Sequence, residues 1–136
     1  MSYLTAFNNQ LVDFAKELCE MFPTDTDIKW SYNMISMIKK ANPRKLYEVF
    51  IQHFTTYRSK ILAKDESFFT SHDFREVGNQ TKKQEYTQTI VKQLKTHWSN
   101  MSENSRNMCW LRFEILFKIS DRIVAASSDT PLAING

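Results

Sequence analysis

Glycine and proline are scarce in this sequence, which has two glycines and three prolines among 136 residues. Small β-barrels and β-sandwiches need many tight turns, and such turns favour glycine, proline, asparagine or aspartate. The scarcity therefore argues against an all-β fold. Two glycines also cannot build the glycine-rich loops that hold phosphate in P-loop and dinucleotide-binding proteins. The common nucleotide-dependent enzymes are disfavoured on this ground.

Cysteine is equally rare: Cys19 and Cys109 are the only two, and neither lies in a CxxC arrangement. Each falls within an apolar helical pattern, so we expect free, buried thiols. Long hydrophobic runs are missing too, because charged residues such as Arg112 and Glu114 interrupt the most apolar segment, 108–124. Placing these charged side chains inside a bilayer would cost too much free energy for the segment to span a membrane. The first ten residues lack the apolar core of a signal peptide, so we expect a soluble protein that is not secreted.

The chain also lacks a strong excess of either charge, since 18 basic and 15 acidic residues leave a net charge of +3. This bias is well short of a basic tail that binds nucleic acid. It is placed unevenly, because residues 1–64 carry nine basic and six acidic groups, whereas residues 65–136 carry nine of each. Any positive field therefore belongs to the first half of the chain.

The sequence does contain much apolar material, with 42% hydrophobic and 13% aromatic residues. A chain this apolar can fill a core without metal ions or disulfides. Its apolar residues recur at alternating spacings of three and four, which is the period of an amphipathic helix. The clearest stripe comprises Leu4, Phe7, Leu11, Phe14, Leu18 and Met21. We therefore predict a first helix that ends before Pro23.

Further helices follow from cap and stop signals. The boundary residues are Thr24 or Asp25 at the start of a second helix, Lys39 and Lys40 at its end, and Asn42 with Pro43 at the start of a third. We expect helices over the approximate ranges 4–21, 26–40, 43–61, 86–98 and 103–125. The last is apolar around about two-thirds of its circumference. It should lie in the middle of the bundle, or else present part of its surface to another subunit.

We therefore predict an all-α protein, a compact bundle of about five helices in a single domain over residues 1–126, followed by a polar C-terminal tail, 127–136. The helical period breaks over 63–79, between the third and fourth helices. This segment is predicted to be a loop with one helical turn, pinned by its phenylalanines Phe68, Phe69 and Phe74.

His72, Asp73 and Glu76 in this loop are the strongest candidates for a metal site, which would need three converging ligands. The alternative, which we favour, is a solvated loop in which Asp73 caps a turn. His53 and His97 each precede an aromatic residue on a helix and are interpreted as boundary residues rather than bases. HExxH and GxSxG motifs are missing as well. We expect no catalytic residue, no metal and no cofactor.

A basic cluster comprises Lys39, Lys40, Arg44 and Lys45 at the junction of the second and third helices. Lysines beside a helix N-terminus suit contact with an anion or a phosphate backbone. The alternative is ordinary solvation of helix ends, where lysine is favoured in the last turn. We favour that alternative, because nucleic-acid binding normally needs a broader basic stripe.

Four large aromatic residues are candidates for an interaction surface, namely Trp30, Tyr32, Trp98 and Trp110. Tryptophan and tyrosine are enriched among the residues that dominate protein interfaces. The alternative, again favoured, is that each packs in the core or at its boundary. Both interpretations stay open at the level of the sequence.

The order of landmarks in the first half resembles a group of small, uncharacterised α-helical proteins of giant, nucleocytoplasmic large DNA viruses. The landmarks are Phe7-Asn8-Asn9-Gln10-Leu11, Phe22-Pro23 with Asp25, Asp27 and Ile28, the run Ile38 to Arg44, and then Tyr57, Ile61, Phe68-Phe69 and Asp73-Phe74. The resemblance covers residues 7–74, and a glycine would be more usual there than Ala63-Lys64. It implies a viral protein in the virion or in the cytoplasm of an infected cell, with no catalytic residue defined.

We therefore predict a non-enzymatic helical module that works through protein contacts, as a virion-associated or self-associating viral protein. The apolar last helix and the aromatic content motivate this hypothesis. Its partner would be a viral protein or a second copy, making a homo-oligomer. The alternative is an accessory protein that binds nucleic acid or phosphate through the basic cluster.

Overall fold

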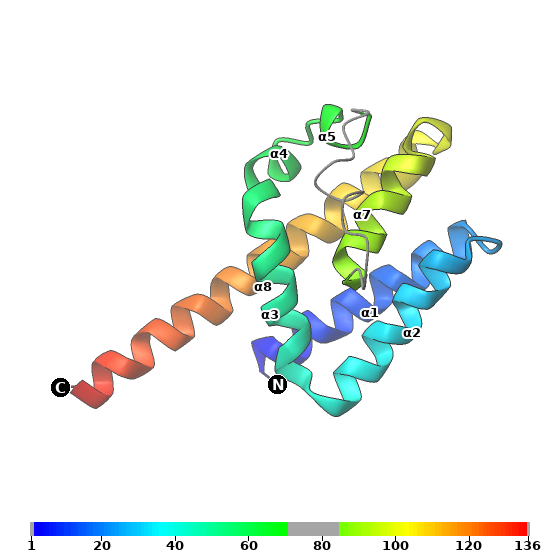
Figure 1. Ribbon diagram of the computed structural model, residues 1–136. Coiled ribbons are helices and arrows are strands. Elements are labelled where there is room, and N and C mark those ends of the chain that lie inside the picture. The colour runs from blue at the N-terminus through cyan, green and yellow to red at the C-terminus, as the bar shows by residue number, and fades with distance from the viewer. Residues whose placement is uncertain (1, 71–84, 136) are drawn as a thin grey trace.

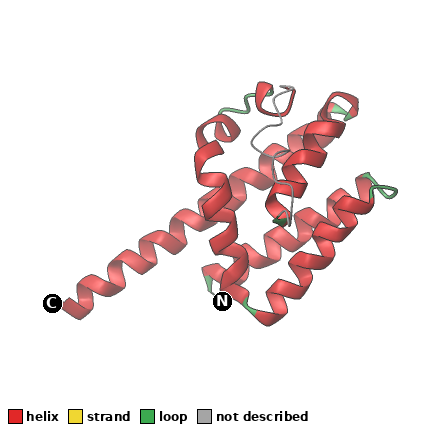
Figure 2. Ribbon diagram, viewed as in Figure 1, coloured by secondary structure: helices red, strands yellow, loops and turns green. Residues whose placement is uncertain are grey.

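The computed structural model describes residues 2–70 and 85–135, with side chains described as far as residue 126. Within these residues every regular element is a helix and no strand occurs (Figure 2). Five of the described helices are longer than six residues: α1 (Tyr3–Met21), α2 (Thr26–Ala41), α3 (Pro43–Phe54), α7 (Tyr86–His97) and α8 (Glu103–Asn135). The prediction of an all-α fold with about five helices is confirmed.

Helices α1 and α2 form an antiparallel pair joined by a short turn (Figure 1). The Ser2 hydroxyl begins α1 by accepting a hydrogen bond of 3.0 Å from the Thr5 N–H. Pro23 lies just beyond the end of α1, as predicted. Asp25, rather than Thr24, caps α2, since its Oδ1 atom accepts from two backbone N–H groups of the first turn. A side chain that satisfies such N–H groups stabilises a helix start.

The third predicted helix is divided by a 3-10 turn. Helix α3 ends at Phe54, the turn η1 covers Thr55–Tyr57, and α4 covers Arg58–Leu62. At the break, the Thr55 hydroxyl donates a hydrogen bond of 2.6 Å to the Ile51 carbonyl. Threonine hydroxyls that bond back to a carbonyl one turn earlier often bend helices. The prediction of one continuous helix over 43–61 is wrong, since the chain leaves the α-helical conformation at Thr55.

Helix α4 ends in a left-handed residue. Lys64 has a φ of 55°, and its N–H donates to the Ile61 carbonyl while the Asp65 N–H donates to the Lys60 carbonyl. These two bonds make a Schellman motif, whose left-handed position is usually glycine. The conformation agrees with the expectation that a glycine would be more usual at Ala63-Lys64.

Replacing Lys64 by glycine should therefore raise the free energy of unfolding by about 0.5–1 kcal/mol, because glycine adopts positive φ without the Cβ clash. Urea unfolding followed by circular dichroism measures the change. Ala63→Gly is the matched control, since Ala63 has a helical φ of −80° and should lose stability on the same substitution. A loss in both variants would contradict the assignment of strain to Lys64.

The predicted helical turn in the loop exists as α5 (Ser67–Thr70). Phe68 and Phe69 from this turn are buried in the core, as expected, whereas Phe74 lies outside the described residues. After α7, the 3-10 turn η2 (Trp98–Asn100) leads to α8. The Ser102 hydroxyl begins α8 by accepting from the Ser105 N–H at 3.1 Å.

A chain of aromatic rings occupies the centre of the bundle. Phe113 of α8 contacts Phe14 of α1, Phe54 of α3 and Phe69 of α5, with ring centroids between 5.2 and 6.3 Å apart. Helix α8 thus touches several elements, as predicted, while α1 packs against α2, α3 and α8 (Figure 1). Leu111 on α8 is nevertheless 54% exposed, so α8 is not enclosed on all sides.

Helix α8 continues to Asn135, ten residues beyond the predicted end at Ala125. The predicted boundary is wrong: the serines and Asp129 lower helix propensity only weakly, by under about 1 kcal/mol each, and α8 also continues through Pro131. Figure 1 shows this end of α8 extending away from the other helices. The division into a domain over 1–126 and a tail over 127–136 stays a prediction. Within the described residues, no helix has the length and apolarity needed to span a membrane.

Candidate functional site

The outward side of α2 exposes two large apolar side chains. Trp30 is 41% exposed and Met37 is 63% exposed. They are seven residues apart, about two helical turns, so they lie on the same side of α2. The opposite side carries Ile28, Ser31 and Ile35, all buried against the rest of the bundle. This arrangement gives α2 one face for the core and a partly apolar face for solvent.

Basic residues lie at the end of α2 and at the start of α3, two helices that meet at a corner (Figure 1). We define the α2 surface as Trp30, Met37, Lys40, Arg44 and Lys45, all of which are exposed. No acidic residue occurs between Asp27 and Glu48. The α2 surface therefore combines apolar side chains with a local excess of positive charge.

The four predicted cations meet at this corner, but they are not equivalent. The half-buried Lys39 donates from Nζ to the Asn9 Oδ1 atom at 3.1 Å. Arg44 lies 3.4 Å from the Glu48 carboxylate and 5.5 Å from the ring centroid of Tyr47. Lys40 and Lys45 make no ion pair with the described part of the chain. These two lysines are the cations most available to a partner.

Two of the four candidate interface aromatics are in the core instead. Trp98 is 0% exposed and Trp110 is 4% exposed. The Trp98 ring stacks on Phe69 at 4.3 Å and contacts the Trp110 ring at 5.1 Å. The favoured interpretation of core packing therefore holds for these two tryptophans, and the alternative of an interface is contradicted, since Trp98 of η2 and Trp110 of α8 both pack against Phe69. Tyr32 is half-buried against the core, and of the four aromatics only Trp30 is exposed.

The start of α2 is held by Asp25, which the sequence identified as a cap but not as a link to α7. Its Oδ2 atom accepts from the Gln93 amide and pairs with His97 Nε2, each at 2.7 Å. The His97 ring stacks on Phe22 at a centroid distance of 4.1 Å. Burial raises the pKa of the Asp25 carboxyl, but the hydrogen bonds from His97, Gln93 and the Ile28 N–H outweigh it, so the net pKa lies below its usual value. This cluster fixes the α2 surface relative to α7.

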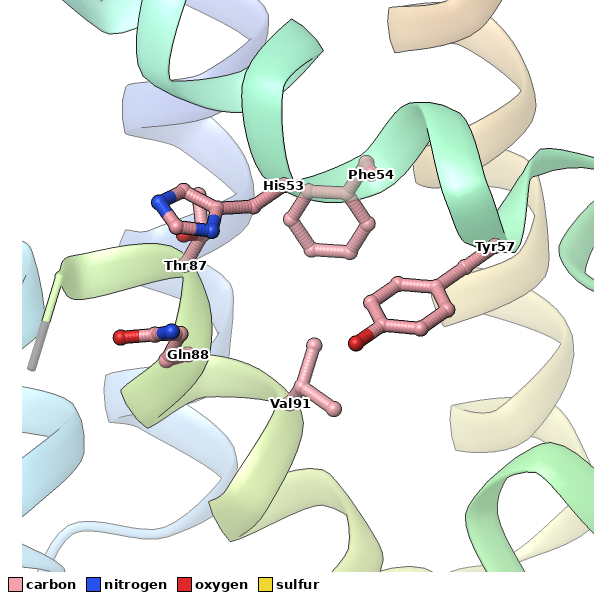
Figure 3. Close-up of a pocket in the computed structure, with 6 residues that line it drawn as sticks. All are labelled: His53, Phe54, Tyr57, Thr87, Gln88 and Val91. Carbon is pink, nitrogen blue, oxygen red and sulfur yellow. The ribbon is translucent and has the colours of Figure 1, made fainter. Parts of the chain in front are cut away.

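A small pocket between α3, η1 and α7 is the main alternative site (Figure 3). It has room for little more than one water molecule, and its lining residues are His53, Phe54, Tyr57, Thr87, Gln88 and Val91. Thr87 is 1% exposed, and its hydroxyl has no hydrogen-bond partner among the described residues. Figure 3 shows His53 and Thr87 together at one side of the pocket. Nucleophilic catalysis needs a base that is itself oriented by a third group, and no described carboxylate pairs with His53.

The two cysteines are free, as predicted, although Cys19 is only half-buried. Burial raises the pKa of the Cys19 thiol, and burial raises the pKa of the Cys109 thiol to about 12. Both are therefore protonated at neutral pH, and a thiol is a much weaker nucleophile than a thiolate. The predicted metal candidates His72, Asp73 and Glu76 lie outside the described residues. In residues 2–70 and 85–126 no group of three His, Cys, Asp or Glu side chains is placed to hold a metal ion.

The chain is similar to an uncharacterised protein of African swine fever virus. It is 27% identical to this protein from two isolates of the virus, over 112 residues that cover 82% of this chain and 83% of the relative. The match agrees with the resemblance to uncharacterised proteins of large DNA viruses and extends well beyond residues 7–74. No family model matches the chain, and no solved structure matches it either. Because the relatives are themselves uncharacterised, the match carries no activity.

Proposed function

We propose that this protein is a non-enzymatic helical module of a large DNA virus that binds another protein through the α2 surface. The observation that carries the proposal is the exposure of Trp30 and Met37 on α2, which has no carboxylate after Asp27. Tryptophan, methionine and arginine are enriched at protein interfaces, whose rim is polar. Trp30 and Met37 suit the centre of such an interface, and the lysines suit its rim.

The energetics support binding at this surface. Burying a side chain the size of Met37 stabilises a complex by roughly 1.5–3 kcal/mol, and tryptophan buries more area still. The other side of α2 is already packed in the core, and Asp25 fixes its first turn. This protein therefore presents a rigid surface, and its own side chains and backbone lose little conformational entropy when a partner binds.

Nucleic-acid binding is the second candidate, supported by the availability of Lys40 and Lys45. Two such cations release few counterions, so they predict weak binding with a shallow salt dependence, about one unit of slope per phosphate contact. The exposed Trp30 and Met37 have no role in contacts to phosphates. The protein-binding proposal accounts for both the apolar and the basic part of the α2 surface.

Site-specific photo-cross-linking tests the proposed function. A photoreactive amino acid at Met37 in the full chain should form one discrete protein adduct in infected cells. Mass spectrometry of the adduct distinguishes a second copy from a different protein. The double substitution Lys40→Glu and Lys45→Glu should reduce adduct formation at least about tenfold, equivalent to about 1.4 kcal/mol.

The matched control is the same reagent at Leu111, an apolar side chain of similar exposure on α8. No discrete adduct is expected from that position. An equal yield of adduct from Leu111 would refute binding through the α2 surface. So would a yield at Met37 that is unchanged by the double substitution Lys40→Glu and Lys45→Glu. Release of bound nucleic acid, with the shallow salt dependence expected of about two phosphate contacts, would favour the second candidate.

A further inference from the structure

We infer that the partner segment is an acidic amphipathic helix, which packs along α2 as an additional helix of the bundle. The inference rests on the proposed function and specifies the chemistry of the partner. It is carried by the line of apolar side chains on α2 and by the positions of the lysines beside that line.

The shape of the apolar stripe matches a helix. Trp30 and Met37 are separated by seven residues, about 10 Å along the axis of α2. A partner helix presents apolar residues at the same repeat, i, i+3 or i+4, and i+7, on one side. Helices that pack in this way lie about 8–10 Å apart, close enough to cover both exposed side chains. One helix is thus sufficient to bury the stripe.

The backbone of α2 excludes the other common way of binding a peptide. An extended peptide adds to a sheet by pairing with unpaired N–H and C=O groups at its edge. The backbone groups of α2 are paired within the helix, and its first turn is capped by Asp25. No strand edge exists in the described residues. Recognition at this face must therefore occur through side chains.

The lysines predict where the partner carries its charge. Lys29 and Lys40 are eleven residues apart, about three helical turns, so they lie along the same flank of the apolar stripe. Both are exposed. Lys45 adds a further exposed cation beyond the end of α2. Carboxylates on the matching flank of a partner helix face these lysines, whereas a basic flank would be repelled.

Peptide binding to the intact protein tests the inference, with Trp30 as an internal reporter. The peptide has about 20 residues, with leucine along one side and glutamate along the flanks, which is long enough to form a helix. Trp98 and Trp110 are buried, so a blue shift of tryptophan emission on binding reports Trp30. We expect saturable binding that weakens at least about tenfold when the flanking glutamates become glutamine.

Two controls separate charge from shape. Trp30→Phe should abolish the emission shift while calorimetry still detects binding. Lys29→Glu with Lys40→Glu should weaken binding of the acidic peptide and strengthen binding of a peptide with lysine flanks. Such a reversal requires direct charge pairing, since a nonspecific loss of folding would weaken both peptides. Circular dichroism of the variants checks that the bundle is intact.

Equal affinity for the glutamate and glutamine peptides would overturn the inference, as would tighter binding of single-stranded nucleic acid that competes at Trp30. The proposed function does not depend on this inference and is tested separately. A discrete protein adduct at Met37, together with no preference for the acidic peptide, retains the protein-binding function and rejects the acidic helix. Loss of the adduct as well rejects both.

Discussion

Replacing Phe113 by alanine should lower the free energy of unfolding by about 3–5 kcal/mol, the range for a phenylalanine removed from a packed core. Its ring is buried and contacts three other phenylalanines from α1, α3 and α5. The loss combines the lost transfer energy with the cavity left between these elements. Urea unfolding followed by circular dichroism measures the midpoint and the slope.

Leu111→Ala provides the control on the same helix, two residues away. Because Leu111 is exposed, its truncation should change stability by no more than about 0.5 kcal/mol. A similar small effect at Phe113 would contradict the position of that ring at the centre of the bundle. A large effect at Leu111 would instead indicate that a second copy covers this part of α8.

Replacing Asp25 by alanine should cost about 2–4 kcal/mol, because the change removes both a helix cap and the hydrogen bonds to α7. The carboxylate accepts two backbone N–H bonds through Oδ1 and bonds from Gln93 and His97 through Oδ2. Its side chain is only 8% exposed, so water cannot replace these partners easily. Thermal unfolding measures the loss.

Asp25→Asn separates the two contributions. Asparagine caps helices as well as aspartate does, so this variant should keep the start of α2 and lose mainly the link to Gln93 and His97. A smaller loss than that of Asp25→Ala is therefore expected. If the two variants were equal, the contacts of Oδ2 would account for the whole effect and the cap for none.

The same carboxyl predicts a dependence of stability on pH. Since the folded protein lowers the pKa of Asp25, the unfolded chain takes up its proton at a higher pH than the folded chain does. The stabilisation is complete above the unfolded pKa of about 3.9. It is lost as the pH falls through the folded pKa. Between pH 6 and the acid range, the wild type should lose more stability than Asp25→Asn, as measured by urea midpoints.

The first half of the fold could be predicted from local signals. Pro23, Asp25 and Pro43 act through the backbone of their immediate neighbours, so their effect on helix ends is independent of the rest of the chain. The break at Thr55 could not be predicted, because a hydroxyl that bonds back one turn does not by itself end a helix, as Ser31 within the continuous α2 shows. The end of α8 could not be predicted for a different reason, since polar composition is a weak helix stop and α8 continues even through Pro131.

The candidate site likewise contains residues that the sequence identifies and contacts that it does not. The basic cluster is recognisable from the sequence because its members are close together, and Trp30 is recognisable by its residue type. The spacing of seven between Trp30 and Met37 is a usable signal for Met37. The sequence leaves two interpretations open for Trp98 and Trp110, because their burial depends on how α5, η2 and α8 meet. The link from Asp25 to His97 spans 72 residues, and no local pattern indicates it.

The packing of α1 against α8 has a consequence for synthesis on the ribosome. Phe14 of α1 emerges early, whereas its partner Phe113 is translated about a hundred residues later. At the usual rates of about 5–20 residues per second, the nascent chain exposes the apolar side of α1 for several seconds before α8 can cover it. A ribosome-bound fragment that stops before α8 should therefore recruit chaperones, and release of the complete helix should end that association.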